Sequence, residues 1–546
     1  MNIRQHGAAA VPIAILAVAL TGCAASPQPS PTSTPTDLTV LTPEATGDVD
    51  SVTWGLSGNE PTTLDPILVG TIGQNTVVSN LCEGLMQVQP DFSVDLGLAE
   101  SYDQPSPEVY VFHIRPDVHF WNGQALTADD VAFSLNRNLD PASGAVNGYQ
   151  YAPVQSIEAT GPLDVTVTLS EPNADILAIL AGLSGAVSQR SAVEAAGADY
   201  GTPAGGLQCT GPYELGQWTS GQGIEIVAND DYWNTDLTPH TSTIHFDAIV
   251  NNNTLTSALL SGDLDGAYAV PPAGINALSK GEGTLYFGNS TQYFLFGPVD
   301  SSGPASDVRV RQALNLAMDK SSFVDRVLGG AGAPMKGFVP PFAFAGNPAS
   351  AALLSAYDKL PGNAAPDIDA ATKLIEEADL SDTSLTIAIT AGDQTALAAA
   401  TLMQAAGTEI GLDMTIEQLQ DTQIFDLFFN PDARKDVDLL ATSGYYETPI
   451  FLSYTGTFVN PDGLVNFIGY DDPDATAKLH DALTATDPEQ SAQSYIAGQD
   501  IWQDAFLTVP VATQYERLYL RDGLTGVPAT QAYVSYPWAA LLGATS

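Results

Sequence analysis

The sequence predicts an α/β protein of two or three domains, and three observations support that prediction. The chain has 546 residues, more than a single hydrophobic core usually organises. Apolar residues make up 44% of it, enough to fill such cores. In the later part of the chain, strand-like stretches such as 385–390 alternate with helical stretches such as 396–410, which is typical of a mixed α/β region.

The N-terminus has the pattern of a secretory signal. Arg4 precedes a 13-residue, mostly apolar stretch from Ala8 to Leu20, which is shorter than the about 20 residues that a membrane-spanning helix needs. The run Leu-Thr-Gly-Cys that ends at Cys23 resembles the bacterial lipobox. That resemblance implies cleavage before Cys23 and diacylation of its thiol, whereas a buried core cysteine is the alternative. We therefore expect 1–22 to be a lipoprotein signal peptide and Cys23 to be the lipidation site.

Residues 23–50 are expected to form a tether. The segment is rich in Pro, Ser and Thr and has almost no large apolar side chains, so it cannot build a core. Proline-rich chain is extended, at about 3.1 Å per residue. A lipid at one end and this spacer behind it would place the folded body outside the cell. No later segment has 18 uninterrupted apolar residues, so we predict no membrane-spanning helix.

The composition is strongly acidic. The chain has 63 Asp and Glu against 17 Lys and Arg, and removal of the signal takes Arg4 away and leaves 16 basic residues. Such a polyanion repels nucleic acid and anionic lipid, so we expect no nucleic-acid partner. An acidic surface could favour cationic ligands, but solubility of a secreted protein is the simpler explanation.

Local patterns predict the first elements in order. Strands are expected at three alternating stretches: 51–56, 109–114 and 165–169. Thr127 with Asp130 three residues later is close to a capping box, which predicts a helix over 129–138. Further helices are expected within 76–86 and over 306–328.

The chain carries none of the common catalytic motifs. There is no G-x-S-x-G elbow, no H-E-x-x-H zinc motif and no P-loop. The six histidines are scattered, and His240 and His245 are five residues apart on an expected strand, a poor spacing for metal ligands. Acid pairs such as Asp129-Asp130 are explained by helix capping. We expect a protein that is not an enzyme and that holds no metal and no cofactor.

Seven landmarks lie in order along the chain: NEPTTLDP (59–66), NLCEGL (80–85), FHIRPDVHFWNGQALTADDVAFSLNR (112–137), CTGPYEL (209–215), NDDYWN (229–234), LLSGDLDGAY (259–268) and VRVRQALNLAMDKSSFVDRVLGGAG (308–332). This ordered set resembles the family 5 extracellular solute-binding proteins, the oligopeptide, dipeptide and nickel receptors of ABC importers. The resemblance extends from about residue 51 to the C-terminus. These segments identify the scaffold and leave the ligand open. Arg309 and Arg311, which flank a helix start, are expected to form salt bridges rather than to bind ligand.

The resemblance implies a two-lobed clamp of the periplasmic-binding-protein type, with an extra third domain. In such receptors the ligand is enclosed between lobes that are joined by a hinge. The chain crosses between the lobes, so each lobe is discontinuous. The expected division is lobe one at 51–88, 207–297 and 506–546, the extra domain at 89–206, and lobe two at 298–505.

The resemblance also suggests two walls of a ligand cleft. In peptide receptors of the family, the segment after the LDP turn lends main-chain hydrogen bonds to an extended ligand, a form of strand addition. In this chain that segment is 69–73, with Thr71, Ile72 and Gly73 as the expected contacts. The second wall is expected at 441–449, a stretch that supplies the family's amine-pairing Asp.

Spacing back from Pro449 places that Asp position on Tyr445, so the acid is missing. Glu447, two residues later, is the candidate replacement. Tyr445 and Tyr446 would suit a sugar or another cyclic ligand, since aromatic faces bind apolar rings, or they serve as packing residues. Ser443 completes the expected wall.

Cys82 and Cys209 remain once Cys23 is assigned to lipidation. Outside the cell an even remainder suggests a disulfide, and two buried, unpaired cysteines are the alternative. The resemblance places both segments in the same lobe, which implies that Cys82 and Cys209 are bridged.

The leading hypothesis is a lipid-anchored, extracytoplasmic receptor of an ABC importer that captures a small solute, first of all an oligopeptide. Its expected partners are the ligand, the ABC permease subunits and the bilayer, reached through Cys23, and it is expected to be a monomer. The alternatives are a sensory lipoprotein that reads a peptide signal, a receptor for sugar-like ligands, and a hydrolase of surface substrates. A neighbouring permease gene would favour the receptor, and a neighbouring kinase gene the sensor.

Overall fold

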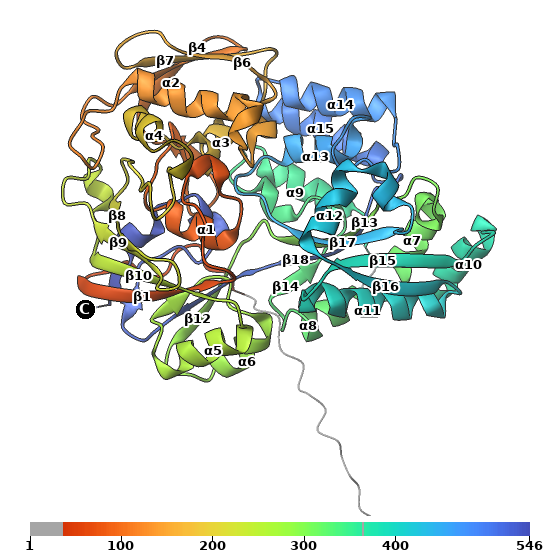
Figure 1. The fold of residues 1–546 in the computed structure, drawn as a ribbon. Helices are drawn as coiled ribbons and strands as arrows, with labels where there is room; N and C mark the ends of the chain where they lie inside the picture. The colour runs from red at the N-terminus through yellow and green to blue at the C-terminus, as the bar shows by residue number, and fades with distance from the viewer. Residues whose placement is uncertain (1–36, 363–364, 546) are drawn as a thin grey trace, which may run out of the picture.

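The computed structural model describes residues 37–362 and 365–545, and its fold is shown in Figure 1. Cys23 and the first part of the expected tether lie outside the described residues. Three bodies are built around three sheets, and two of them form the halves of a clamp. The predicted α/β class is therefore confirmed. No helix among the described residues is long and apolar enough to cross a membrane.

The first body, lobe one, contains a seven-stranded sheet. Its strands, in spatial order, are β12 (Thr284–Gly288), β19 (Glu516–Leu520), β11 (Gly266–Ala267), β1 (Val49–Ser57), β10 (Thr241–Ile249), β9 (Ile224–Ala228) and β8 (Tyr213–Trp218). The central strand β1 runs parallel to both of its neighbours and is the strand predicted at 51–56. Trp54 of β1 packs against Tyr268 and Trp538, which brings the C-terminal segment into the same core. The body also contains α1 (Ile72–Val78), α5 (Asn252–Ser261), α6 (Ile275–Leu278) and the pair β20 (Leu524–Thr525) and β21 (Gly543–Ala544).

The second body, the small domain, is built on a four-stranded antiparallel sheet. Its strands are β4 (Ala99–Ser106), β5 (Val109–Ile114), β7 (Asp164–Leu169) and β6 (Val154–Ala159). Other elements of this region are β2 (Met86–Val88), β3 (Val94–Leu96), α2 (Ala128–Asn136), α3 (Ile176–Leu180) and α4 (Arg190–Ala196). The predicted strands 109–114 and 165–169 are confirmed, and so is the capping box of Thr127 and Asp130 at the start of α2.

The third body, lobe two, contains a six-stranded sheet covered by helices. In spatial order its strands are β14 (Gly332–Pro334), β18 (Val509–Gln514), β13 (Tyr293–Pro298), β17 (Leu439–Gly444), β15 (Ser384–Thr390) and β16 (Asp413–Leu419). Its helices are α7 (Val308–Ala317), α8 (Lys320–Arg326), α9 (Ser350–Lys359), α10 (Ile368–Ala378), α11 (Gln394–Glu409), α12 (Asp421–Phe429), α13 (Phe451–Val459), α14 (Pro473–Thr484) and α15 (Pro488–Trp502). The predicted strand 385–390 and helix 396–410 correspond to β15 and α11.

The chain crosses between the two large sheets twice. One crossing, 289–292, joins β12 of lobe one to β13 of lobe two, and the other is the single residue Tyr515 between β18 and β19. The two crossings are hydrogen-bonded to each other, because Gln514 N–H donates to Gln292 O (3.0 Å) and Gln292 Nε2 donates to Glu516 Oε2 (3.2 Å). Strands β13 and β18 thus belong to the sheet of lobe two. The crossings between the lobes therefore differ by several residues from the boundaries expected at 297/298 and 505/506.

Two expected helices differ from those in the structure. The stretch 306–328 forms two helices, α7 and α8, because the Asp319 side chain accepts from Ser322 N–H (2.8 Å) and caps a new helix there. The helix expected within 76–86 begins earlier, as α1, and ends at Val78. Thr71 starts it through a capping box, a local signal that outweighs the apolar spacing farther along.

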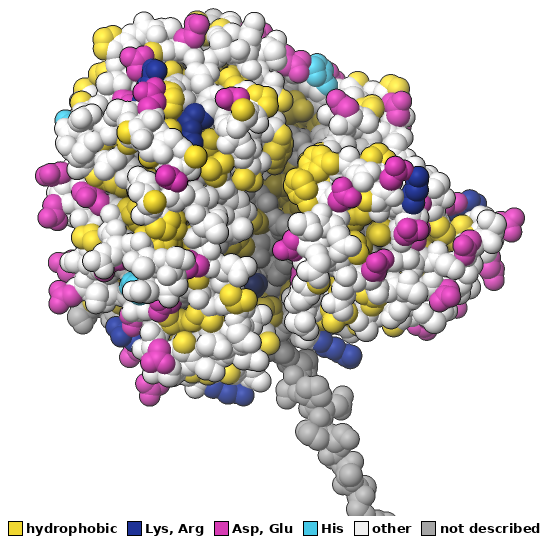
Figure 2. Space-filling model, viewed as in Figure 1, with side chains coloured by type: hydrophobic (Ala, Val, Ile, Leu, Met, Phe, Trp, Pro, Cys, Tyr) yellow, Lys and Arg dark blue, Asp and Glu magenta, His cyan; other side chains and the backbone are white. Residues whose placement is uncertain are grey.

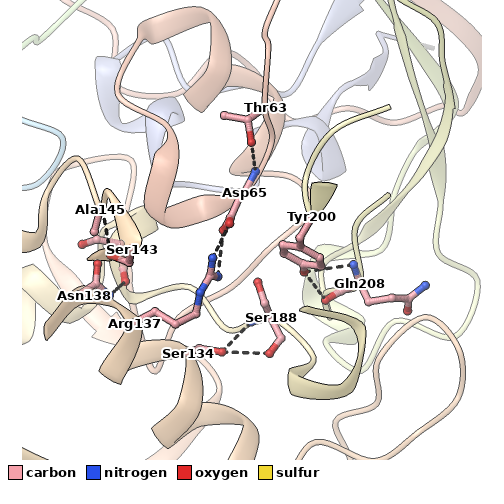
Figure 3. Close-up of polar contacts among 11 residues, drawn as sticks. Thr63, Asp65, Ser134, Arg137, Asn138, Ser143, Ala145, Ser188, Tyr200 and Gln208 are labelled. Carbon is pink, nitrogen blue, oxygen red and sulfur yellow. Dashed lines mark hydrogen bonds and ion pairs between the residues drawn. The ribbon is translucent and has the colours of Figure 1, made fainter. Parts of the chain in front are cut away.

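One disulfide bond and one ion pair link separate parts of this scaffold. The predicted disulfide is confirmed: Cys82 is bonded to Cys209, with Cα atoms 5.0 Å apart. In Figure 3, Asp65 and Arg137 point toward each other with Tyr200 beside them. Arg137 Nη1 donates to Asp65 Oδ1 (3.0 Å), and Nη2 pairs with Oδ2. Since Arg137 follows α2, this pair ties the small domain to lobe one.

Arg309 and Arg311 lie outside the cavity and have structural roles. Arg309 pairs with Asp307, as expected. Arg311 forms no such pair with any of the described residues. The expectation of a salt bridge there is wrong, because its guanidinium is buried and donates to four backbone carbonyls, those of Ala305, Ser306, Ala505 and Phe506. Among the described residues, no group of three or more His, Cys, Asp or Glu side chains is arranged to hold a metal ion.

Candidate ligand-binding cleft

A cavity of about 200 Å³ lies where the three bodies meet. Figure 2 shows the surface hollowed along the line between the two lobes, with hydrophobic side chains on both sides of its upper part. The cavity is lined by thirteen residues: Gly70, Val146, Asn147, Tyr149, Gln150, Tyr293, Tyr445, Tyr446, Glu447, Ile450, Ser453, Tyr454 and Thr457. Gly70 belongs to lobe one, the segment 146–150 to the small domain, and the remainder to lobe two.

The first predicted wall contributes Gly70 rather than Thr71, Ile72 and Gly73. The side chain of Gln74 accepts the N–H groups of both Gly70 and Thr71 (3.2 Å each), so these main-chain donors are already occupied. Thr71 is exposed and caps α1, and Gly73 is buried in the first turn of that helix. The three predicted contacts are therefore not among the residues that line the cavity.

The second predicted wall contributes Tyr445, Tyr446 and Glu447. Tyr445 makes a direct bond between the lobes, since its hydroxyl donates to Gly70 O (3.2 Å) and accepts from Asn75 Nδ2 (3.3 Å). Ser443 is exposed at the end of β17 and does not line the cavity.

Tyr446 is 4% exposed and belongs to a cluster of aromatic rings. Its ring centroid lies 5.7 Å from that of Tyr293 and 4.3 Å from that of Tyr454. Its backbone is held as well, because Thr291 Oγ1, in the crossing segment, donates to Tyr446 O (2.6 Å). The cluster thus connects the cavity wall with the crossing at 289–292.

Among the described residues that line the cavity, Glu447 is the one that carries a charge. Its carboxylate accepts from Asn147 Nδ2 (3.1 Å), from Leu183 N–H and from Ser535 Oγ (3.5 Å). Burial raises the pKa of Glu447 to about 7, although those hydrogen bonds act in the opposite direction. Each of the three donors lies outside lobe two, so the side chain connects lobe two to the rest of the molecule.

The lining suits reversible binding. Five tyrosines, two amides and one carboxyl offer ring faces and hydrogen-bonding groups. Among the described lining residues there is no histidine or lysine that could activate the hydroxyls of Ser453 or Thr457. No basic side chain is available there to pair with an anionic group of a ligand.

Sequence reasoning missed the part of the lining that comes from distant segments. These residues are Asn147, Tyr149 and Gln150 of the small domain, Tyr293 of β13 and Tyr454 of α13. None of them stands in a motif or a periodic pattern, and only the packing of the three bodies brings them together.

The chain was compared with known protein families. Residues 93–466, more than half of the chain, match the model of bacterial extracellular solute-binding proteins, family 5. The glutathione-binding protein GsiB of Escherichia coli (strain K12) is 25% identical over 471 residues, which cover 82% of this chain and 86% of that protein.

Solved structures show the same fold. The binding protein AgaA of A. tumefaciens R10, in complex with agropinic acid, matches with a TM-score of 0.76 and 22% identity over 90% of this chain and 98% of that one. The oligopeptide-binding protein AppA of Bacillus subtilis, in complex with a nonapeptide, matches with a TM-score of 0.74 and 20% identity over 92% of this chain and all of that one, 100%. At these identities the likeness concerns the fold alone.

Proposed function

Because this chain belongs to family 5 of the bacterial extracellular solute-binding proteins, we propose that it is the lipid-anchored receptor of an ABC importer. It captures a small solute between its lobes and delivers it to the permease subunits in the membrane. The chain itself performs no covalent chemistry.

The observation that carries this proposal is the cavity at the junction of the three bodies. Its walls come from both lobes and the small domain, so a ligand in it would touch all three at once. Such contacts favour the closed clamp, because a ligand shifts a conformational equilibrium by its differential affinity for the two states. We propose that the crossings at 289–292 and Tyr515 are the hinge.

An oligopeptide is the first candidate for the solute. Relatives carry peptide or glutathione in their names, and such ligands bear an ammonium group. Glu447 is the carboxyl in the cavity that could receive that group, in place of the acid missing at Tyr445. Three protein donors already bind Glu447, so an ammonium ion would have to share it with them.

A neutral, ring-shaped ligand is the second candidate. Five tyrosines line the cavity and no basic residue is among its described lining residues. Aromatic faces bind apolar ring faces of sugars without requiring charge.

The anchor is proposed from the sequence alone, since Cys23 lies outside the described residues. Residues 39–47 run along lobe one, where Thr42 N–H donates to Val527 O (3.0 Å) and Gly47 forms a bridge with Ala544. We propose that the spacer therefore extends from Cys23 to about residue 37 rather than to residue 50.

Calorimetry on the mature chain would test the binding function. The panel comprises glutathione, di- to pentapeptides, oligosaccharides and metal chelates, and mass spectrometry identifies any solute that co-purifies. We expect one class to bind, and Tyr454→Ala to weaken that binding at least tenfold. Uptake of the same solute should be lost in cells that lack the gene. Absence of binding for every class, with no co-purified solute, would contradict the proposal.

A further inference from the structure

A second cavity, which we call the rear cavity, lies between the small domain and lobe two. Its volume is about 440 Å³, about twice that of the cleft cavity. The small domain contributes 92–94, β4, β5 and 172–178, and lobe two contributes 346–348, Pro449 and the segment 485–491, in which α15 begins. The two bodies touch here directly, since Ala174 N–H donates to Leu483 O (2.7 Å). Figure 1 shows β4 and α14 at the same end of the molecule.

Asp175 is the one charged residue among the described residues that line the rear cavity. The residue is only 4% exposed. Its Oδ2 accepts from Ser453 N–H (2.8 Å) and Ser453 Oγ (2.7 Å), whereas its Oδ1 has no hydrogen-bond partner among the described residues. Burial raises the pKa of Asp175 to about 6, so the carboxyl is ionised at pH 7.5. A buried carboxylate without a counter-charge is costly, and a cation beside it would offset that cost.

The rest of the lining combines apolar side chains with polar ones, the polar ones being Ser93, Gln104, Asn173, Asn347, Thr486 and Ser491. Five prolines line the rear cavity: Pro107, Pro172, Pro348, Pro449 and Pro488. Three aromatic residues, Phe92, Tyr102 and Tyr110, face the same space. In ligand pockets the apolar walls hold the body of a small molecule and the polar groups orient it. An apolar ring fits these walls, and a single positive charge fits Asp175.

We propose that the rear cavity binds a small organic amine, with the ammonium group at Asp175 Oδ1 and an apolar ring between the prolines and the tyrosines. The site is distinct from the cleft, and its occupant differs from the transported solute. Its occupancy would hold the small domain against lobe two. It also borders the cleft through α13, because Ser453, which binds Asp175, lines the cleft cavity as well.

Calorimetry on the mature chain at pH 7.5 tests this proposal with 2-phenylethylamine as the probe. Two probes of similar shape serve as comparisons, neutral 2-phenylethanol and anionic 3-phenylpropionate. We expect the amine to bind and each comparison probe to bind at least tenfold more weakly. Asp175→Asn, which keeps an oxygen for Ser453, should weaken amine binding at least tenfold.

Two further variants locate the site. Ala485→Trp places a large side chain in the rear cavity and should abolish amine binding, with the thermal unfolding midpoint measured to show that the chain is folded. Glu171→Gln removes an exposed charge four residues from Asp175 and should leave the affinity unchanged within twofold.

Several results would overturn the inference. They are the absence of amine binding, equal binding of the alcohol, and amine binding that survives both Asp175→Asn and Ala485→Trp. Loss of amine binding in Glu447→Gln with retention in Asp175→Asn would place the amine in the cleft. Binding and uptake of the transported solute are measured separately, so this proposal can fail while the receptor function stands.

Discussion

At the scale of the residue, Glu447 stands out. Its carboxyl receives hydrogen bonds from the small domain and from the C-terminal segment, while its backbone belongs to lobe two. Its pKa is raised from 4.5 to about 7, chiefly by burial. In this position the side chain connects lobe two with both of the other bodies.

The raised pKa has a consequence for stability. Between pH 4.5 and 7 the folded protein holds the Glu447 proton more tightly than the unfolded chain does. This contribution is complete below about pH 4.5 and is lost as the pH rises through 7, at about 1.4 kcal/mol for each unit of difference. Glu447→Gln, which mimics the protonated form, should therefore unfold at a higher temperature than the wild type at pH 8.

Thermal unfolding at pH 5, 6, 7 and 8 measures this difference, which should shrink toward pH 5. Glu417→Gln, an exposed acid on β16, is the matched control and should follow the wild type at every pH. A difference that is constant across the series would mean that Glu447 is not protonated in the folded protein at low pH.

At the scale of the element, the segment around Asp65 is bound to the end of α2. The side chain of Asp65 is 3% exposed and that of Arg137 is 17% exposed, and the guanidinium lies over the Tyr200 ring at 5.9 Å (Figure 3). The pair sits at the border between lobe one and the small domain, so it orients one body on the other.

Asp65→Asn should destabilise the protein by about 3 kcal/mol, because it leaves the Arg137 charge enclosed without its partner. The free energy of unfolding in urea measures this effect. The double variant Asp65→Leu/Arg137→Met should lose less than the single one. Glu194→Gln breaks an exposed pair with Arg190 and should cost under about 0.5 kcal/mol. Equal costs at the two sites would show that the Asp65–Arg137 pair contributes as little as a surface ion pair.

The disulfide is the second link at this scale. It joins the segment that follows α1 to the segment that precedes β8 and closes a loop of sequence separation 127. The chain-entropy model gives about 4–5 kcal/mol for a loop of this length. The double variant Cys82→Ala/Cys209→Ala should lose stability up to that amount.

Thiol labelling of the denatured, unreduced mature protein should find neither cysteine reactive, and labelling after reduction should find both. Two reactive thiols before reduction would contradict the bridge.

At the scale of the whole molecule, three bodies meet at one cavity and two short crossings connect the two large sheets. The crossings are rich in buried polar side chains, and Gln531 Oε1 accepts from both Ser290 Oγ (2.8 Å) and Thr291 N–H (3.0 Å). Gln531 Nε2 has no hydrogen-bond partner among the described residues, so the network is only partly satisfied. These bonds tie the C-terminal segment to the crossing that we propose as part of the hinge.

The proposed attachment to the membrane depends on Cys23. Cys23→Ala should release the protein into the medium or leave the signal uncleaved, because the thiol that would carry the lipid is gone. Cell fractionation and immunoblotting measure this. Asp37→Asn, at the start of the described residues, is the control and should stay with the membrane. A Cys23→Ala variant that is cleaved and as firmly membrane-bound as the wild type would contradict the lipid anchor.

The sequence alone was sufficient to predict several local elements and the protein family. Strands such as 109–114 and the capping box at Thr127 followed from periodicity and side-chain chemistry within a few residues, which short windows of sequence encode. The ordered landmarks predicted the family, and through it the fold class and the disulfide. Tyr445, Tyr446 and Glu447 of the predicted second wall line the cavity, and their place was found by spacing back from Pro449.

Only the tertiary structure decided which other residues face the cavity. Thr71 caps α1 and Gln74 occupies the main-chain donors beside it, a competition that the order of residues does not reveal. Tyr293 and Asn147 reach the cavity from segments far apart in the chain. Their meeting depends on how the three bodies pack, and that geometry is set by long-range contacts, which no local pattern records.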